Sequence, residues 1–319
     1  MRAIRVHEFG GPDALILEDV SPPEPGAGQS LVRLYYAGLN YTEIYQRSGV
    51  TKVQLPFIPG SEGFGVIERS ARFSVGTRVA WAGYPGAYAE LAVVPDHRLV
   101  AVPDDISDDV AAALLLQGIT AHYLIEDSYC ARAGDVALVH AAAGGVGLLL
   151  TQLLTAKGVA VIGTVSSDAK AALARDAGAH QIVRYDHEHV AAAVRGVYPD
   201  GVDVVYDSVG QATWTASLAS LRRRGTIVLY GHASGKVAPV DPMLLARHGS
   251  LTLTRPLIGD FIPTANDLQE RVDRLFGWVR NGSLRPLITR KYSLADAAQA
   301  HRDLEARRTS GKALLRTAN

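Results

Sequence analysis

The sequence predicts an α/β protein in which a doubly wound parallel sheet accompanies a second, β-rich domain. At 319 residues, the chain exceeds the length at which a single hydrophobic core keeps growing, so two domains are expected. From Asp135 onward, short apolar segments alternate with helical patterns, which is typical of a parallel sheet covered on both faces. Before that point, segments rich in Val, Ile and Tyr alternate with Pro and Gly clusters, which is typical of strands and turns.

The expected elements follow one another in a regular order. The β-rich domain begins with the strands ALILEDV, SLVRLYYAGLN, GFGVIERS and TRVAWAG. The strands of the parallel sheet are DVALVH, VAVIGTV, QIVRY, VDVVYDSV, TIVLYG and SLTLT, and the helices between them are GGVGLLLTQLLTAKG, SDAKAALARDAG, EHVAAAVRGV, TWTASLASLRRRG and DPMLLARHG. After Pro256, LQERVDRLFGWVRNG and SLADAAQAHRDLEA have amphipathic helical patterns, and GKALLR is a candidate strand that returns to the first domain.

Charge and composition exclude several classes of partner. Lys and Arg number 32, as do Asp and Glu, so the chain offers no electrostatic footprint for nucleic acid or an anionic membrane. The start MRAIRVHEFGG lacks the apolar core of a signal peptide, and polar residues and glycines interrupt the apolar stretch 141–154. We therefore expect a cytoplasmic protein. The single cysteine, Cys130, excludes an intramolecular disulfide and is expected to be buried and unreactive.

A glycine-rich turn joins the first expected strand of the parallel sheet to its helix. In HAAAGGVG, the residues Ala142, Gly144 and Gly147 take the register of a dinucleotide fingerprint, with Ala at the first position. Such a turn brings backbone N–H groups to a pyrophosphate at the helix start, and the predicted contacts are Ala143, Gly144, Gly145 and Val146. The alternative is a turn that only packs strand against helix. His140, just before the turn, is expected to be a hydrogen-bonded strand-end residue rather than a base.

The end of the next strand indicates which nucleotide is bound. NAD-binding proteins place an acid there for the ribose 2′-hydroxyl, whereas this chain has Ser166 and Ser167, with Lys170 close by. Two hydroxyls and a positive charge suit a 2′-phosphate, so NADPH is the expected cofactor. In the alternative interpretation, Ser166, Ser167 and Asp168 only cap the following helix. Asp168 could be taken for the acid that binds the ribose, but it lies within the helix start rather than at the strand end, so its role is ambiguous.

Several segments together resemble the zinc-less quinone oxidoreductases of the medium-chain dehydrogenase/reductase superfamily. The segments, in order, are GGPDALILEDV, NYTEIYQRSGV, PGSEGFGVI, AAALLLQGITAHYL, HAAAGGVG, VVYDSVG, RRRGTIVLYG and LTRP. The resemblance implies a Rossmann domain over residues 121–256, inserted into a GroES-like catalytic domain formed by residues 1–120 and 257–319. It also implies an active site in the cleft and a homodimer joined through the nucleotide-binding domains.

The resemblance implies that no metal is bound. Zinc-dependent relatives carry Cys where this chain has Asn40, and a His where this chain has Ser61. The four-cysteine structural zinc loop is absent from the sequence as well. Without a Lewis acid, the substrate has to be intrinsically electrophilic, so a quinone or an α,β-unsaturated carbonyl is expected.

The resemblance also assigns catalytic residues. It places Asn40 and Tyr45 near the nicotinamide and the substrate, and it includes Glu43, where many relatives have Asp. From the residues alone, Tyr41 and Tyr45 share a helix face and could equally belong to the core.

Further cofactor contacts are implied on the nucleotide-binding side. Thr120 matches a position near the nicotinamide or is a buried helix hydroxyl, and Tyr185 packs on the adenosine side or is a strand-end aromatic. Arg255, which the resemblance assigns to both the catalytic and the cofactor-binding residues, turns toward the cleft or forms a surface ion pair. The remaining expected contacts follow parallel strands, at the edge where such sheets bind ligands: Ser208, Tyr230 and Gly231.

The expected function is an NADPH-dependent reductase of quinones or α,β-unsaturated carbonyls. An enoyl-thioester or 2-alkenal reductase shares this chemistry and differs mainly in pocket shape. An alternative of another class is an NADPH-binding sensor or scaffold with little turnover.

Overall fold

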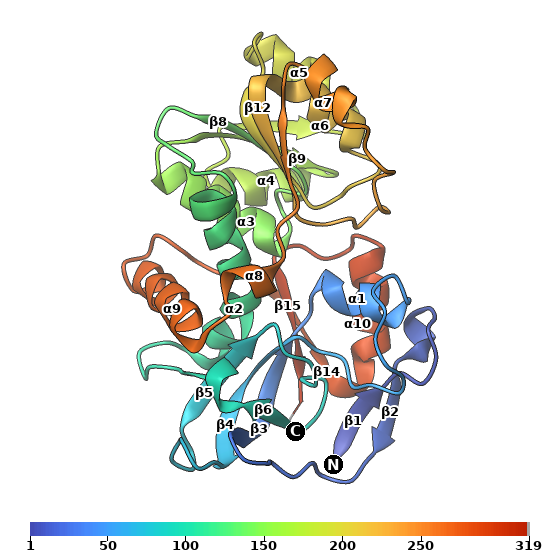
Figure 1. The fold of residues 1–319 in the computed structure, drawn as a ribbon, viewed down its shortest axis with the longest axis vertical. Coiled ribbons are helices and arrows are strands. Elements are labelled where there is room, and N and C mark those ends of the chain that lie inside the picture. The colour runs from blue at the N-terminus through green and yellow to red at the C-terminus, as the bar shows by residue number, and fades with distance from the viewer. Residues whose placement is uncertain (318–319) are drawn as a thin grey trace. The chain divides into compact units, whose positions relative to one another are not determined.

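The computed structural model describes residues 1–317 and divides into two compact units (Figure 1). The first unit contains Met1–Ile119, Ile262–Arg280 and the chain from Pro286 onward, and the second contains Thr120–Phe261 and Asn281–Arg285. The sequence analysis instead assigned all of residues 257–319 to the first domain. The segment Asn281–Arg285 is held to the second unit because the backbone N–H of Arg285 donates to the side-chain oxygen of Gln152 at 2.7 Å.

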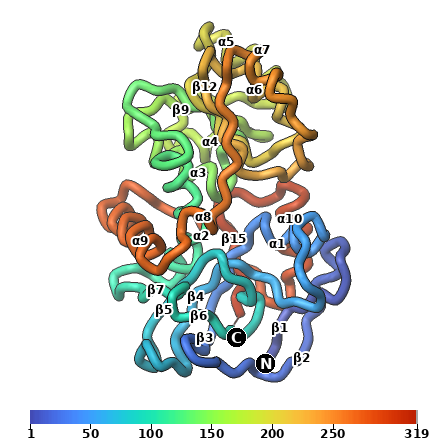
Figure 2. The backbone as a smooth tube through the Cα atoms, in the orientation of Figure 1, coloured from blue at the N-terminus to red at the C-terminus, as the bar shows by residue number. Residues whose placement is uncertain are grey.

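The first unit is built on a seven-stranded sheet in the order β14-β15-β3-β4-β5-β7, with β6 paired to β3. The strands of this sheet are β3 (Gln29–Gly38), β4 (Glu62–Arg69), β5 (Arg78–Ala82), β6 (Leu91–Pro95), β7 (Val100–Ala101), β14 (Ile288–Ser293) and β15 (Lys312–Arg316). A separate two-stranded sheet pairs β1 (Arg2–Arg5) with β2 (Ile16–Asp19). The helices of the first unit are α1 (Tyr41–Arg47), α9 (Ala265–Arg280), α10 (Ala297–Glu305) and most of α2 (Asp108–Tyr123). The strand β15 pairs with β3, so the returning strand expected from GKALLR is confirmed (Figure 2).

The second unit is a six-stranded, fully parallel sheet in the order β10-β9-β8-β11-β12-β13. Its strands are β8 (Val136–Val139), β9 (Ala160–Val165), β10 (Gln181–Arg184), β11 (Val202–Asp207), β12 (Leu221–Leu229) and β13 (Thr252–Thr254). Its helices are α3 (Gly145–Ala156), α4 (Asp168–Asp176), α5 (Val190–Val197), α6 (Trp214–Ser220), α7 (Pro242–Arg247) and α8 (Ile258–Phe261). In chain order the strands lie 3-2-1-4-5-6, so the predicted doubly wound Rossmann sheet is confirmed.

One helix is shorter than the sequence predicts. The expected helix TWTASLASLRRRG ends at Ser220, and β12 begins at Leu221, which pairs with Val202. Leu221 is buried in the core of the sheet, and Arg224 adopts a left-handed backbone conformation with φ of 60°. Burial of Leu221 therefore overrides the helical pattern of the following arginines.

Cys130 is a second correction. The sequence analysis expected a buried thiol, but Cys130 is exposed and lies just after the π-helical turn Leu124–Ser128. Its Sγ contacts the carbonyl oxygen of Glu126 at 3.0 Å. The residue lies in a connecting loop, where the chain runs over the protein surface.

Candidate functional site

In the first unit, the predicted residues Asn40 and Glu43 form the N-terminal cap of α1. Glu43 Oε2 accepts the backbone N–H of Asn40 at 2.9 Å, and Oε1 accepts the backbone N–H of Ser61 at 2.8 Å. Burial raises the pKa of Glu43 to about 7, although the hydrogen bond from Ser61 opposes this shift. Because Glu43 is fully buried and both its oxygens are engaged, the structure gives it a local positioning role, and the catalytic role implied by the resemblance stays a prediction.

The side chain of Asn40 is hydrogen-bonded at every available position. Its Oδ1 accepts from Lys312 Nζ at 2.7 Å and from Gln117 Nε2 at 3.1 Å. Its Nδ2 donates to Gly38 O at 3.3 Å and to Glu62 Oε2 at 3.2 Å. An asparagine amide has two acceptor and two donor positions, so a ligand would bond this amide only by displacing one of the four partners.

A buried ion pair completes this cluster. Lys312 Nζ lies 2.5 Å from Glu62 Oε2, and the two side chains are only 2% and 1% exposed. The other carboxylate oxygen, Glu62 Oε1, accepts the backbone N–H of Leu116 at 2.8 Å. A Cβ atom on Gly38 would lie 2.1 Å from Glu62 Oε2 and 2.8 Å from Lys312 Nζ, so any other residue at this position would displace the ion pair. The cluster of Asn40, Glu62, Gln117 and Lys312 is called the Lys312 cluster below.

The sequence analysis missed Gln117 and Lys312 and did not assign Glu62. One signal was present, because Lys312 stands at the start of an apolar strand pattern, GKALLR, where a lysine requires a partner if it is buried. Within residues 1–317 there is no group of three His, Cys, Asp or Glu residues that could hold a metal ion. The positive charge beside Asn40 and Glu62 is the lysine ammonium.

Tyr45 lies on the same short helix and is half-buried. Its ring centroid is 5.4 Å from that of Tyr41, at an interplanar angle of 54°. Both rings are partly exposed, so neither belongs fully to the core. Tyr45 thus remains accessible to a ligand, and its role stays a prediction.

In the second unit, the glycine turn follows β8 and leads directly into α3. Gly144 is the N-cap of this helix, and Gly145 is its first residue. A Cβ on Gly147 would lie 2.4 Å from the carbonyl oxygen of Ala141, so this glycine permits the close packing of helix and turn. The first-turn N–H groups of a helix lack intrahelical partners, so Gly145 and Val146 present donors to a phosphate here.

After β9, one serine caps the next helix and the other lies beside a lysine, so each of the two interpretations of these serines applies to one residue. Ser167 is the N-cap of α4 and accepts the backbone N–H of Lys170 at 3.3 Å, so the capping role is confirmed for this residue. Ser166 Oγ lies 3.4 Å from Lys170 Nζ, which leaves a hydroxyl and an ammonium together. Asp168 pairs with Arg184 at the end of the neighbouring strand β10, and Arg184 also pairs with Asp186 at 2.7 Å. The sequence analysis did not identify Arg184.

The other predicted cofactor contacts lie mostly at strand ends. Tyr185 follows β10 and is 40% exposed, whereas Thr120 is half-buried in α2. Tyr230 and Gly231 follow β12, and their backbone N–H groups donate to Asp207 O at 2.9 and 3.3 Å. A Cβ on Gly231 would lie 2.5 Å from the carbonyl oxygen of Ser208, so the ends of β11 and β12 are in close contact.

Arg255 follows β13 and is exposed. Its Nη1 donates to Pro256 O at 3.0 Å, and its Nη2 lies 3.5 Å from His232 Nδ1. Burial lowers the pKa of His232, and the positive charge of Arg255 adds to this effect. The guanidinium thus lies beside a neutral imidazole.

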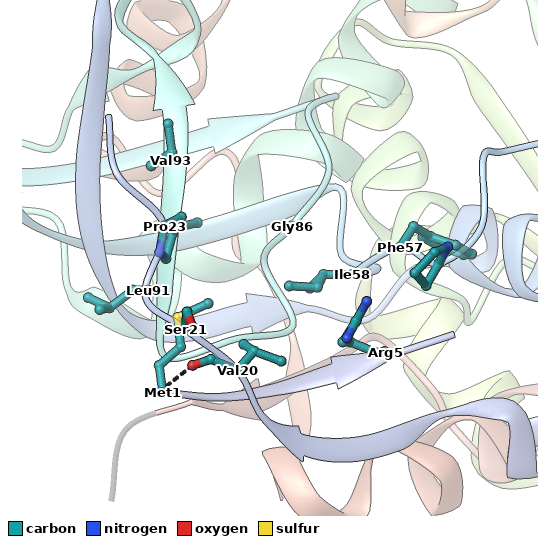
Figure 3. Close-up of a pocket in the computed structure, with 12 residues that line it drawn as sticks. Met1, Arg5, Val20, Ser21, Pro23, Phe57, Ile58, Gly86, Leu91 and Val93 are labelled. Carbon is teal, nitrogen blue, oxygen red and sulfur yellow. Dashed lines mark hydrogen bonds between the residues drawn. The ribbon is translucent and has the colours of Figure 1, made fainter. Parts of the chain in front are cut away.

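An open hollow of about 480 Å³ lies elsewhere in the first unit (Figure 3). Apolar side chains, including Val20, Phe57, Ile58 and Leu91, line most of it. None of the predicted site residues is among the lining residues. Within residues 1–317, no helix combines the length and the apolar character needed to cross a bilayer.

Comparisons with known proteins match both units. The family described as "Alcohol dehydrogenase GroES-like domain" matches residues 26–104, and the family described as "Zinc-binding dehydrogenase" matches residues 145–276. The chain is 45% identical over 322 residues to a quinone oxidoreductase of Pseudomonas aeruginosa, covering 98% of this chain and 99% of the relative. It is 37% identical over 323 residues to a 2-haloacrylate reductase of Burkholderia sp, covering 97% of each. A solved mycobacterial protein, complexed with NADPH, is 44% identical with a TM-score of 0.96, covering 99% of both chains.

Proposed function

The chain belongs to the zinc-less quinone oxidoreductase family of the medium-chain dehydrogenase/reductase superfamily, and we propose that it transfers a hydride from NADPH to a quinone or an α,β-unsaturated carbonyl. The names of its relatives support both acceptor classes. One relative is a quinone oxidoreductase, and another is a 2-haloacrylate reductase, whose name specifies a conjugated alkene.

The loops of the second unit fit NADPH. The helix start would hold the pyrophosphate through the backbone N–H groups of Gly145 and Val146, and Ala143 and Gly144 are proposed to line the same turn, where Gly144 N donates to Ala141 O at 2.8 Å. Ser166 and Lys170, with Ser167 between them, would bind the 2′-phosphate. Further contacts are proposed for Thr120, Tyr185, Ser208, Tyr230, Gly231 and Arg255. When bound, NADPH supplies the hydride.

In the first unit, Asn40 and Tyr45 are proposed to orient the acceptor. A quinone or enone is already electrophilic, so hydrogen bonding to the oxygen that gains charge is sufficient stabilisation. The Tyr45 hydroxyl is suited to this role, because the ring is partly exposed. The Lys312 cluster holds the Asn40 side chain in one orientation through hydrogen bonds to its Oδ1. We therefore propose that Asn40 contributes mainly as a rigid surface against which the acceptor is placed.

One observation carries the choice of NADPH over NADH. The Lys170 ammonium lies beside Ser166 Oγ at the end of β9, and the nearby carboxylate of Asp168 is paired with Arg184. The Lys170→Ala variant should weaken NADPH binding by about 1.5–3 kcal/mol, the range for a charge-assisted hydrogen bond, and leave NADH binding nearly unchanged. If Lys170→Ala weakens NADPH and NADH binding equally, Lys170 does not bind the 2′-phosphate.

The activity itself is tested by NADPH oxidation across quinones, enones, 2-alkenals and enoyl thioesters. Turnover with quinones or enones supports the proposal, and a strong preference for enoyl thioesters or 2-alkenals would favour that alternative. If every acceptor is inert while NADPH still binds, the protein is a sensor or scaffold.

Three further expectations remain predictions. They are a homodimer, a cytoplasmic location and the absence of a nucleic-acid partner. Light scattering coupled to size-exclusion chromatography measures the mass of the assembly directly. A mass of one chain at micromolar concentration would contradict the dimer.

A further inference from the structure

A buried hydrogen-bonded network crosses three parallel strands of the second unit. Thr164 lies in β9, His140 directly follows β8, Asp207 ends β11, and Ser217 lies in α6. His140 Nδ1 is 3.1 Å from Thr164 Oγ1, and His140 Nε2 is 3.0 Å from Ser217 Oγ. Ser217 Oγ is in turn 2.7 Å from Asp207 Oδ2. All four residues are at most 1% exposed, and we refer to them as the His140 network.

The carboxylate at one end fixes the direction of every hydrogen bond. Asp207 Oδ1 accepts the backbone N–H groups of Val209 and Gly210 at 2.8 and 3.0 Å, and the Thr213 hydroxyl contacts both oxygens. Ser217 has a single hydroxyl hydrogen, which it donates to Asp207, so it must accept from His140.

The same reasoning determines the tautomer of His140. Its Nε2 carries the hydrogen that Ser217 accepts, and burial lowers the pKa of His140, which favours a neutral ring. Nδ1 therefore has a lone pair and accepts from the Thr164 hydroxyl. Hydrogen bonds thus run in one direction, from Thr164 through His140 and Ser217 to Asp207.

The network connects the starts of three loops. After β8 comes the glycine turn, after β9 the short segment of Ser166 and Ser167 that leads into α4 with Lys170, and after β11 the loop beginning at Ser208. Backbone contacts reinforce the connection, because Ala142 N donates to Thr164 O at 3.1 Å and His140 N donates to Tyr206 O at 3.0 Å. A shift of the His140 ring would therefore move all three loops relative to one another.

We propose that His140, held as its Nε2–H tautomer, is a positioning residue that sets the relative placement of these three loops for a dinucleotide. The proposal rests on the proposed function, which assigns the same loops to NADPH. His140 is only 1% exposed, so the proposal assigns it no direct contact with the cofactor. Two of the three loops serve the part that NADPH and NADH share, and the segment after β9 also carries Ser166, so changes to the network weaken both cofactors, and NADPH at least as much as NADH.

The first test uses Thr164→Val, which removes one hydroxyl and nearly preserves the shape of the side chain. The dissociation constants of NADPH and NADH should each rise about fivefold to tenfold, because loops that the network no longer holds must be ordered when the cofactor binds. The KM for the quinone and kcat should change less than about twofold, because the network does not contact the acceptor. Thr164→Ser retains the hydroxyl and should restore both cofactor affinities.

A matched control separates positioning from general stability. Val205 is fully buried in β11, in the same sheet but outside the network, so Val205→Ala lowers stability without removing a hydrogen bond of the network. Its cofactor affinities should stay close to those of the unaltered protein. If Thr164→Val affects cofactor binding no more than Val205→Ala does, the network has only a structural role, and the proposal is wrong.

The tautomer is tested independently by nitrogen-15 NMR of the imidazole. The proposal requires a neutral His140 with its proton on Nε2 at pH 7, and a ring protonated on Nδ1 overturns it.

The cofactor variants distinguish failure of this proposal from failure of the proposed function. Lys170→Ala should weaken NADPH alone, whereas Thr164→Val should weaken NADPH and NADH together. If Lys170→Ala leaves the NADPH affinity unchanged while Thr164→Val still weakens both cofactors, only the assignment of Lys170 to the 2′-phosphate is wrong. A protein that binds neither cofactor overturns both the proposed function and the positioning role.

Discussion

Lys312 Nζ lies 2.7 Å from Asn40 Oδ1, so a residue of the C-terminal strand β15 holds the N-cap of α1. The same ammonium pairs with Glu62 at the start of β4, which β3 separates from β15 in the sheet, and the two charged side chains are only 2% and 1% exposed. Removing one member of a buried pair leaves the other charge without compensation. The Lys312 cluster is therefore expected to control both stability and the placement of Asn40.

Replacing Lys312 by Met should be strongly destabilising. The Lys312→Met variant leaves Glu62 buried and unpaired, and we expect the free energy of unfolding to fall by about 3–5 kcal/mol. The double variant Glu62→Gln with Lys312→Met removes both charges and should recover much of this loss. Urea unfolding measures both effects, and a single-variant loss below about 1 kcal/mol would show that the pair is not buried as described.

Glu43 predicts a stability that depends on pH. Its pKa is raised from 4.5 to about 7 in the folded protein, so between these values the folded chain retains a proton that the unfolded chain releases. This proton uptake by Glu43 stabilises the folded state. Its contribution to the free energy of unfolding is fully present below pH 4.5 and is lost as the pH rises through 7, with a total change of about 3 kcal/mol. Glu43→Gln does not titrate, so its unfolding free energy should vary less over this range. Parallel profiles for the two proteins would contradict the raised pKa.

Tyr45→Phe tests whether the tyrosine orients the acceptor or delivers a proton. As an orienting residue, its loss should lower kcat/KM by no more than about tenfold to a hundredfold, with NADPH affinity nearly unchanged. Proton delivery instead predicts a loss beyond about a thousandfold and a solvent isotope effect that disappears in the variant. Steady-state kinetics with one quinone and one enone distinguishes the two roles.

No zinc should be required for activity. The resemblance places Asn40 and Ser61 at positions where zinc-dependent relatives have ligands, and the structure places the ammonium of Lys312 beside Asn40. Elemental analysis should find substoichiometric zinc, and a chelator should leave the rate unchanged. Activity that is lost with the chelator and returns with zinc would disprove this expectation.

Much of the fold could be predicted because hydrophobic periodicity reports local structure. The six parallel strands, the glycine turn at Gly144 and the cap at Ser167 each have a signal within a few neighbouring residues. The early end of α6 could not be predicted, because it depends on the pairing of Leu221 with Val202, a contact across the sheet. The exposure of Cys130 likewise depends on how its loop lies on the surface.

The Lys312 cluster could not be predicted for the same reason. Asn40 and Lys312 are separated by 272 positions, and only the pairing of β15 with β3 brings their segments together. The resemblance identified Asn40 as a site residue, but it did not indicate that the amide is hydrogen-bonded at every position. The His140 network also joins residues that are far apart in the sequence, from β9, the end of β8, β11 and α6, although the expectation of a hydrogen-bonded strand-end histidine is confirmed.

The central claim is hydride transfer from NADPH to a conjugated acceptor, and isotope labelling tests it most directly. NADPH carrying deuterium at both C4 positions is oxidised with an α,β-unsaturated ketone, and the product is analysed by NMR and mass spectrometry. The account predicts one deuterium, bound to the β-carbon of the saturated ketone, with the second new hydrogen coming from solvent. A saturated product without deuterium at that carbon, or no reduction of quinones and enones at all, would contradict it.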